Sequence, residues 1–414
     1  MPSMISTAHY DGRIVVIGGG HAGGELVASL RSQGHAGEIV LVSAEPHLPY
    51  QRPPLSKAYL SDQISKEKLL TRPASFYANQ GIDTLLESRV VSIDRAGKSI
   101  AIDGGRILSY GRLALATGTR PRMLEVQGSQ LEGVHYLRTI DDVVRIRDEL
   151  GRIDDLVIIG GGFIGLEVAA ICRKLGKRVS ILESADRLMS RVTSAAVSSF
   201  YEHYHEKHGV DIHLRTHVGS LTGTSGRVDR VQCSNGLSLR AQLVVIGIGV
   251  VPNIELALGA GLPCDGGIMV DEFARTADPD IVAAGDCTNH PNSLLGRRMR
   301  LESVHNAVEQ ARSAAASLCN REHQYSQIPW FWSDQYDLKL QMVGVPLGHD
   351  AEIVRGDTSS AGFSVFYFRG GALQAVDSVN RPVDHMLARR FLAARTPLTE
   401  DQAANPQFDL RSLR

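Results

Sequence analysis

Two glycine-rich loops of the form G-x-G-x-x-G constrain what this chain can fold into, because each stands between an apolar, β-branched run and a helix-like stretch. The first loop follows the run 13–17 and contains Gly18, Gly20 and Gly23. In such a loop the first glycine makes a tight turn, the second lets the backbone approach a pyrophosphate, and the third allows close helix packing. The phosphate then lies at the N-terminus of the helix. We therefore predict a dinucleotide-binding strand–helix–strand unit at this point.

The second loop repeats this arrangement. It follows the apolar run 156–159 and contains Gly160, Gly162 and Gly165, with a helix expected to run through Leu175. A single loop of this form is a weak signal, since a structural turn explains about half of bare matches. Two copies in the same strand–helix–strand context are a strong one, and they predict two nucleotide-binding units.

An acidic residue follows the second strand of each predicted unit. Glu183 comes directly after the expected strand 178–182. A carboxylate there accepts hydrogen bonds from ribose hydroxyls and repels a 2′-phosphate, which favours NADH over NADPH. Arg187 and Arg191 lie close enough in sequence to weaken that preference. In the first copy Glu45 takes this role, although it comes later than the expected place of the ribose acid.

The two copies also end alike. Each runs through short strands to a final apolar strand that closes in glycine, at 113–118 and at 243–247. We interpret the chain as internally duplicated, with one dinucleotide bound by each copy.

A further buried strand, 276–286, ends in Gly285-Asp286, and a helical stretch follows at 302–319. Next to two nucleotide folds, this strand is expected to return the chain to the first domain. Asp286 at its end is expected to bind a ribityl hydroxyl of a flavin. From about residue 323 short aromatic strands such as 363–368 predict a third domain. The expected fold class is α/β, with two Rossmann-like dinucleotide-binding domains and a C-terminal α+β domain. The expected boundaries are 1–118 with 249–322, 119–248, and 323–414.

Composition limits the remaining classes of function. Hydrophobic residues make up 43% and charged residues 21%, a mixture typical of globular proteins. The formal net charge of -1 disfavours nucleic acid as a partner. No apolar run approaches the roughly 20 residues that cross a bilayer, so we expect no membrane association. Residues 1–12 lack the features of a signal peptide, which predicts a cytoplasmic location.

The five cysteines are widely spaced and form no C-x-x-C pair, which disfavours a disulfide framework, a zinc site and a redox-active dithiol. Cys172 and Cys287 are expected to be buried and inert. His203, His205 and His208 alternate with charged residues, and we interpret them as a solvated surface rather than a metal site. No metal ligand is therefore assigned.

Four segments add a family resemblance: 52–57 (RPPLSK), 116–118 (ATG), 285–286 (GD) and 329–336 (PWFWSDQY). With them in view, the sequence resembles the FAD-dependent ferredoxin reductases of the putidaredoxin reductase type, within the glutathione-reductase-like superfamily. The resemblance spans nearly the whole chain. It implies that electrons pass from NADH to FAD and then singly to a small [2Fe–2S] ferredoxin, which serves a bacterial cytochrome P-450 or a Rieske-type oxygenase.

The resemblance also assigns cofactor contacts. It makes 1–118 with 249–322 the FAD-binding domain and 119–248 the NAD-binding domain. Ala44 stands where the family pattern has an acid, which affects the ribose contact assigned to Glu45 but not the cofactor. The FAD contacts, besides the first glycine loop, are Ala22, Arg52, Lys57, Val90, Ala116, Thr117, Gly118, Arg138, Gly285, Asp286 and Val304, and the NADH contacts, besides the second loop and Glu183, are Phe163, Ile164, Glu167 and Gly249.

Three residues are candidates for a catalytic role. Lys57 and Glu167 match an ion pair that the superfamily places beside the flavin, where the cation steadies the reduced ring and the acid borders the nicotinamide. Their ordinary interpretations are a solvated lysine and an acid in the first turn of a helix. Trp332 is assigned to the site because the family places its segment near the flavin, although clustered aromatic residues often belong to a core.

The electron acceptor is expected to dock on basic residues. Arg72, Arg312 and Lys339 align with basic positions of the family pattern, although scattered solvated cations would look the same. Alternative functions remain open. A reductase of rubredoxin or of a small molecule such as monodehydroascorbate would carry similar flavin machinery, and so would a redox-signalling flavoprotein like apoptosis-inducing factor.

Overall fold

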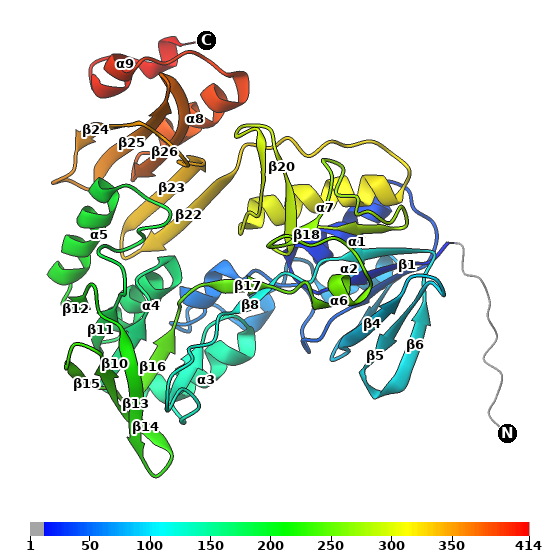
Figure 1. Cartoon of the computed structure of the whole chain (residues 1–414), viewed down its shortest axis with the longest axis horizontal. Helices are drawn as coiled ribbons and strands as arrows, with labels where there is room; N and C mark the ends of the chain where they lie inside the picture. Colours follow the sequence, from blue (N-terminus) through cyan, green and yellow to red (C-terminus); the bar gives the residue numbers. More distant parts are fainter. Residues whose placement is uncertain (1–11, 414) are drawn as a thin grey trace. The chain divides into compact units, whose positions relative to one another are not determined.

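A computed structural model describes residues 12–413 of the 414-residue chain. The segment whose composition predicts no signal peptide lies outside the described residues, apart from Gly12. The described chain forms two compact units, each assembled from three stretches of sequence (Figure 1). Within the described residues, the first unit contains residues 12–51, Glu67–Arg120 and Pro252–Gln327, and the second contains Arg52–Lys66, Pro121–Val251 and residues 328–413.

The first unit is built on a parallel five-stranded sheet. Its order is β19-β7-β1-β2-β3, and all four residues of β1 are buried, as expected of a strand covered on both faces. The register places Ile14 opposite both Ile39 of β2 and Arg112 of β7. The strands are β1 (Ile14–Ile17), β2 (Ile39–Val42), β3 (Ile82–Leu85), β7 (Arg112–Leu115) and β19 (Ile281–Ala283).

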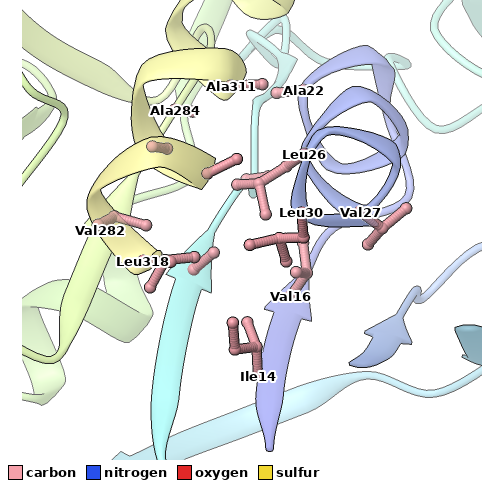
Figure 2. Close-up of a cluster of buried hydrophobic side chains, with 14 of the residues drawn as sticks. Ile14, Val16, Ala22, Leu26, Val27, Leu30, Val282, Ala284, Ala311 and Leu318 are labelled. Carbon is pink, nitrogen blue, oxygen red and sulfur yellow. The ribbon is translucent and has the colours of Figure 1, made fainter. Parts of the chain in front are cut away.

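Helices α1 (His21–Ser32) and α7 (Val304–Leu318) pack together on one face of this sheet. Figure 2 shows Leu26 and Leu30 of α1 directed toward Ala311 and Leu318 of α7, with Val16 of β1 beneath them. These side chains are buried and form one of the apolar cores of the unit. Because α7 lies within the expected helix 302–319, that part of the sequence prediction is confirmed.

The other face of the sheet is covered by a second apolar cluster. Ile93 and Ile100, from a small antiparallel sheet in the order β4-β5-β6, pack there with Ala257 of helix α6. The remaining elements of the unit are β4 (Val90–Asp94), β5 (Ser99–Ile102), β6 (Arg106–Ser109), α2 (Ala74–Asn79), α6 (Glu255–Gly259), β18 (Ile268–Met269), β20 (Thr288–Asn292) and β21 (Arg297–Met299).

The second unit contains a parallel sheet of similar design, in the order β12-β11-β10-β16-β9. An antiparallel sheet, β13-β14-β15, packs on it through an apolar cluster that includes Val157, Val231 and Val244. Its strands are β9 (Val134–Tyr136), β10 (Asp155–Ile159), β11 (Arg178–Leu182), β12 (Val210–His213), β13 (Val218–Thr224), β14 (Arg227–Cys233), β15 (Ser238–Arg240) and β16 (Leu243–Ile246), and its helices are α3 (Ile140–Leu150), α4 (Phe163–Lys174) and α5 (Ala195–Lys207).

The end of the chain adds an antiparallel sheet to the second unit, in the order β22-β23-β26-β25-β24. Helix α8 packs against β23 and β26, and α9 against β24. This confirms the expected C-terminal α+β region. Its elements are β22 (Trp330–Gln335), β23 (Leu338–Gly344), β24 (Ala351–Asp357), β25 (Gly362–Arg369), β26 (Ala372–Val379), α8 (Pro382–Ala394) and α9 (Glu400–Ala404).

The chain passes between the units along β8 (Thr119–Pro121) and β17 (Val250–Pro252), which pair as a two-stranded sheet. No helix in residues 12–413 is long and apolar enough to span a membrane. The α/β fold class with two Rossmann-like sheets is confirmed, whereas the three domain boundaries drawn from the sequence stay a prediction.

Candidate functional site

In the first unit the glycine loop lies between β1 and α1, and each glycine has a distinct environment. Gly18 has a φ of 115°, and a Cβ there would lie 2.1 Å from the carbonyl oxygen of Ala116. A Cβ on Gly23 would lie 1.8 Å from the carbonyl oxygen of Gly18. Gly20 is different, because a Cβ there would meet nothing within 4 Å. The fold therefore leaves no room for a side chain at Gly18 or Gly23, whereas a side chain at Gly20 would face open space.

The second unit reproduces this pattern at the loop between β10 and α4. Gly160 has a φ of 109° and approaches Gly247, whose carbonyl oxygen would lie 2.4 Å from an added Cβ. Gly165 packs as closely on Gly160, at 2.1 Å, whereas Gly162 has nothing within 4 Å. Gly162 is also the N-cap of α4 and offers no side chain to the free N–H groups of that helix. Both loops thus fit a pyrophosphate at a helix N-terminus.

The acid of the second unit supports its glycine loop. Glu183 Oε2 accepts a hydrogen bond from the amide of Gly161 at 2.7 Å, and Oε1 accepts one from the amide of Ala185 at 2.8 Å. The carboxylate is thereby fixed at the end of β11, beside the loop. The nearby Arg187 is occupied elsewhere, because its guanidinium donates to Ser190 and Ser198 at 2.8 Å. These contacts hold the Arg187 side chain against residues 190–198.

The first unit carries its acid differently. β2 ends at Val42 and β11 ends at Leu182, so the residue that corresponds in the register to Glu183 is Ser43. Glu45 lies two residues further along. Its Oε2 accepts a hydrogen bond from the hydroxyl of Tyr50 at 2.5 Å, and its amide donates to Ser43 Oγ at 3.2 Å. The two acids are thus held in place by different contacts.

Lys57 and Glu167 are brought together within the second unit. Lys57 Nζ lies 2.6 Å from Glu167 Oε2, and the carboxylate is only 4% exposed. The local structure explains this contact: Pro53–Ser56 forms a short 3-10 helix, and Glu167 lies in the second turn of α4, which packs against it. A buried charge requires a partner, and here it has one.

Two serines complete the surroundings of this carboxylate. Ser56 Oγ donates to Oε2 of Glu167 at 2.5 Å, and Ser333 Oγ donates to Oε1 at 2.6 Å. The sequence reasoning missed Ser333. The available signal was the alternation of strand β22, which places Ser333 and Phe331 on one face and Trp332 on the other. Phe331 packs on Phe163 of α4, with ring centroids 5.0 Å apart.

Trp332 lies on the face of β22 opposite Ser333 and is half-buried. Its ring centroid is 5.4 Å from that of Trp330, which packs in turn on His385 and under the guanidinium of Arg389. The two tryptophans therefore form a cluster with α8. The assignment of Trp332 to the active site stays a prediction.

The other assigned cofactor residues are divided between the units. In the first unit Gly285 approaches Ala22, with 3.1 Å between an added Cβ and the Cβ of Ala22, and Val304 begins α7. In the second unit Arg52 donates to the carbonyl oxygen of Arg138 at 2.7 Å. Val90, Ala116, Thr117, Gly118 and Asp286 lie in the first unit, and Phe163, exposed Ile164 and Gly249 in the second.

The expected burial of two cysteines is confirmed. Cys172 and Cys287 are both fully buried, and all five cysteines are free. Burial raises the pKa of Cys172 to about 12 and raises that of Cys287 as well. The thiolate form is the nucleophile, so these thiols are poor reactants at neutral pH.

The interpretation of the histidine run as a solvated surface is wrong at His205. His203 and His208 are exposed, but His205 is completely buried and its Nε2 lies 2.8 Å from Oε1 of Gln335. The reason is helical spacing, because Tyr201 and His205 lie four residues apart on the buried side of α5.

The basic residues proposed for docking are not equally available. Glu25 binds two of them, Arg72 Nη2 at 2.7 Å and Arg312 Nε at 3.0 Å, and Arg312 also contacts Glu309 at 2.6 Å. This group of four side chains carries no net charge. Lys339, in the second unit, is exposed. The structure leaves the docking assignment untested.

The fold and the two glycine loops define an oxidoreductase that binds two dinucleotides. Comparison with known sequences makes the class specific: the chain belongs to the pyridine nucleotide-disulphide oxidoreductase family, whose model matches residues 12–311. A second model, described as reductase C-terminal, matches residues 330–414. The resemblance inferred from the sequence motifs is thereby confirmed, and with it the use of FAD and a nicotinamide dinucleotide.

Three relatives match along nearly their whole length. Rhodocoxin reductase of Rhodococcus erythropolis is 47% identical over 398 residues, covering 96% of this chain and 93% of the relative. Putidaredoxin reductase of Pseudomonas putida is 42% identical over 405 residues, covering 97% and 96%. Rubredoxin-NAD(+) reductase of the same species is 37% identical over 369 residues, covering 89% and 96%.

Solved structures agree. The covalent complex of putidaredoxin reductase with putidaredoxin contains a chain that matches with a TM-score of 0.94 at 42% identity, covering 96% of this chain and 97% of that one. The ferredoxin reductase of the CYP199A2 system from Rhodopseudomonas palustris also matches with a TM-score of 0.94, at 42% identity and with 97% and 99% coverage.

Proposed function

We propose that this chain is an NADH-dependent reductase of a [2Fe–2S] ferredoxin that supplies an oxygenase. The observation that carries the proposal is the end-to-end match, including residues 330–414, to reductases named for such carriers. Bound FAD supplies the chemistry that joins a two-electron donor to a one-electron acceptor. A cytoplasmic location is part of the proposal, because the five cysteines are free and NADH is an intracellular reductant.

The preference for NADH is assigned to Glu183. Its carboxylate is fixed at the end of β11 by the amides of Gly161 and Ala185. A fixed negative charge at this place repels a 2′-phosphate, and the guanidinium of Arg187 donates to Ser190 and Ser198 rather than to Glu183. Arg191 is exposed and lies near Gly249, so it is a nearby cation whose influence on this preference remains to be tested.

We assign direct electron transfer from the flavin to the acceptor protein, with no dithiol between them. The cysteines in the described residues are buried or half-buried and unpaired, and no two lie close in sequence. The family name refers to disulphide substrates, but this chain has no dithiol of the C-x-x-C or C-x-x-x-x-C kind to pass electrons onward. Lys57 and Glu167 are assigned to the flavin and nicotinamide ends of this route, on the strength of their buried contact.

The ferredoxin is proposed to contact Arg72 and Arg312 of the first unit and Lys339 of the second. Because Arg72 and Arg312 are already paired with Glu25, an acidic ferredoxin must compete with that carboxylate for them. Lys339 has no such competitor among the contacts that the structure describes, so it is expected to make the larger contribution to electrostatic steering.

The test is NADH-driven reduction of purified [2Fe–2S] ferredoxins, with rubredoxin and ferricyanide as alternative acceptors, across a salt series. Lys339→Glu should slow ferredoxin reduction at low salt and leave ferricyanide reduction unchanged. Lys207→Glu, at an exposed lysine on α5, is the matched control. Faster turnover with rubredoxin than with every ferredoxin would favour the second candidate, which the rubredoxin reductase relative supports.

A further inference from the structure

One face of strand β22 carries buried polar side chains. Ser333 and Gln335 are 0% and 1% exposed, and they lie on the side of the strand that packs against α4. Buried polar groups require hydrogen-bond partners, so such a pair inside an apolar interface needs a reason. Phe331, on the same face, supplies the apolar packing against Phe163.

The reason is a chain of hydrogen bonds that ends on Glu167. His205 Nε2 lies 2.8 Å from Gln335 Oε1, Gln335 Nε2 donates to Ser333 Oγ at 3.1 Å, and Ser333 Oγ donates to Glu167 Oε1 at 2.6 Å. Burial lowers the pKa of His205 to about 4, so the ring is neutral and its single proton is assigned to Nε2. Every donor in the chain then points toward the carboxylate.

With this series of hydrogen bonds in place, the two oxygens of the Glu167 carboxylate have different partners. Oε1 is taken by Ser333, while Oε2 accepts from Ser56 and contacts Lys57 at 2.6 Å. Lys57 thus contacts Oε2, the oxygen that Ser333 does not bind. A lysine held by a single oxygen is less completely neutralised, and its positive field extends further into a poorly solvated site.

We propose that Ser333 and Gln335 are positioning residues, which hold one oxygen of Glu167 away from Lys57 so that the lysine keeps its positive field. The inference rests on the proposed function, in which that lysine steadies reduced FAD. It gives the C-terminal sheet a part in the redox site, because Ser333 and Gln335 belong to β22 while Glu167 belongs to the nucleotide fold.

The test removes the hydroxyl. In Ser333→Ala, Oε1 is free to close on Lys57, so the midpoint potential of bound FAD should shift to more negative values. The rate constant for reduction of bound FAD by NADH should fall about tenfold, the usual effect of losing a hydrogen bond to a charged group. FAD content and the dissociation constant of NADH should stay unchanged, and Ser333→Thr, which keeps a hydroxyl, should restore the potential.

Two further variants separate positioning from packing. Ser378→Ala removes another fully buried serine of the same sheet and should leave the potential unchanged. Gln335→Leu keeps Ser333 but removes the amide that orients it, and it should give a smaller shift in the same direction. It also serves as the test if Ser333→Ala does not fold.

An unchanged or more positive potential in Ser333→Ala, or an equal shift in Ser378→Ala, would overturn the positioning role. The proposed function is judged separately, from the parent protein's reduction of ferredoxin by NADH. A silent Ser333→Ala in a protein that reduces ferredoxin therefore refutes only the inference drawn here.

Discussion

Replacing Gly162 by alanine should weaken nicotinamide dinucleotide binding without harming the fold. The residue has φ -82° and ψ -179°, a conformation that alanine adopts freely, and its added Cβ would meet no protein atom within 4 Å. Substitutions of glycine at compatible positions stabilise proteins by about 0.4–1 kcal/mol, because the unfolded chain loses freedom. The open space in front of Gly162 is where the pyrophosphate is expected, so the methyl group would displace the phosphate from the helix N-terminus.

The size of the effect follows from the hydrogen bonds at risk. A bond from a backbone N–H to a charged acceptor contributes about 1.5–3 kcal/mol. Since about 1.4 kcal/mol corresponds to tenfold in an equilibrium constant, the loss of one such bond weakens binding by about 10- to 100-fold. We expect the KM for NADH to rise by this factor with ferricyanide as acceptor, and NAD+ titrations should show the same loss.

Two control variants test the other glycine loop and a glycine that has no room for a side chain. Gly20→Ala places the same methyl in the first unit, again with nothing within 4 Å, and should lower FAD retention instead of NADH affinity. Gly165→Ala would place a Cβ 2.1 Å from the carbonyl oxygen of Gly160 and should destabilise the protein outright. If Gly162→Ala keeps its melting temperature and its KM for NADH within twofold of the parent value, the loop does not hold the pyrophosphate and the reasoning is refuted.

Three further outcomes are expected. Glu183→Gln keeps an acceptor for the amide of Gly161, 2.7 Å away, but removes the charge, so the ratio of kcat/KM for NADPH over NADH should rise about tenfold; an unchanged ratio shows that Glu183 does not select the cofactor. Burial raises the pKa of Asp377 to about 7, so the folded state keeps a proton that the unfolded chain loses above pH 4. Stability from this group therefore falls between about pH 4 and 7, by on the order of 4 kcal/mol, and urea unfolding of Asp377→Asn should lack that slope; parallel pH profiles would contradict it. Alkylation of every cysteine that reacts should leave NADH reduction of ferricyanide intact, and inactivation of a folded, alkylated protein would disprove direct electron exit.

The nucleotide folds could be predicted from the sequence because their constraints are local. A positive φ at Gly18 and at Gly160 admits little besides glycine, so the loops stand out in the printed letters. The strands beside them are short buried runs, and β11 has the bounds 178–182 that its apolar residues indicate. The strand expected at 363–368 lies within β25 for the same reason.

The surroundings of the candidate site could not be predicted, because they depend on contacts between distant segments. Ser333 reaches Glu167 only when a C-terminal strand packs on α4. The alternation of β22 places this serine on one face of the strand but does not indicate which segment covers that face. His205 looks like a surface residue among charged neighbours until Gln335 is placed opposite it. Likewise, Arg312 looks like a free cation until helices α1 and α7 pack and bring Glu25 to it.

The first sheet to be synthesised is not the first that can be completed. Its edge strand β19 pairs with β7, with Ile281 opposite Leu113, and α7, which covers α1, ends only at Leu318. All five strands of the parallel sheet in the second unit lie between residues 134 and 246. On a ribosome that adds about 5–20 residues per second, this sheet can close while the apolar face of α1 still lacks its cover. The parallel sheet whose first strand is made earliest in translation is therefore the later of the two to be completed.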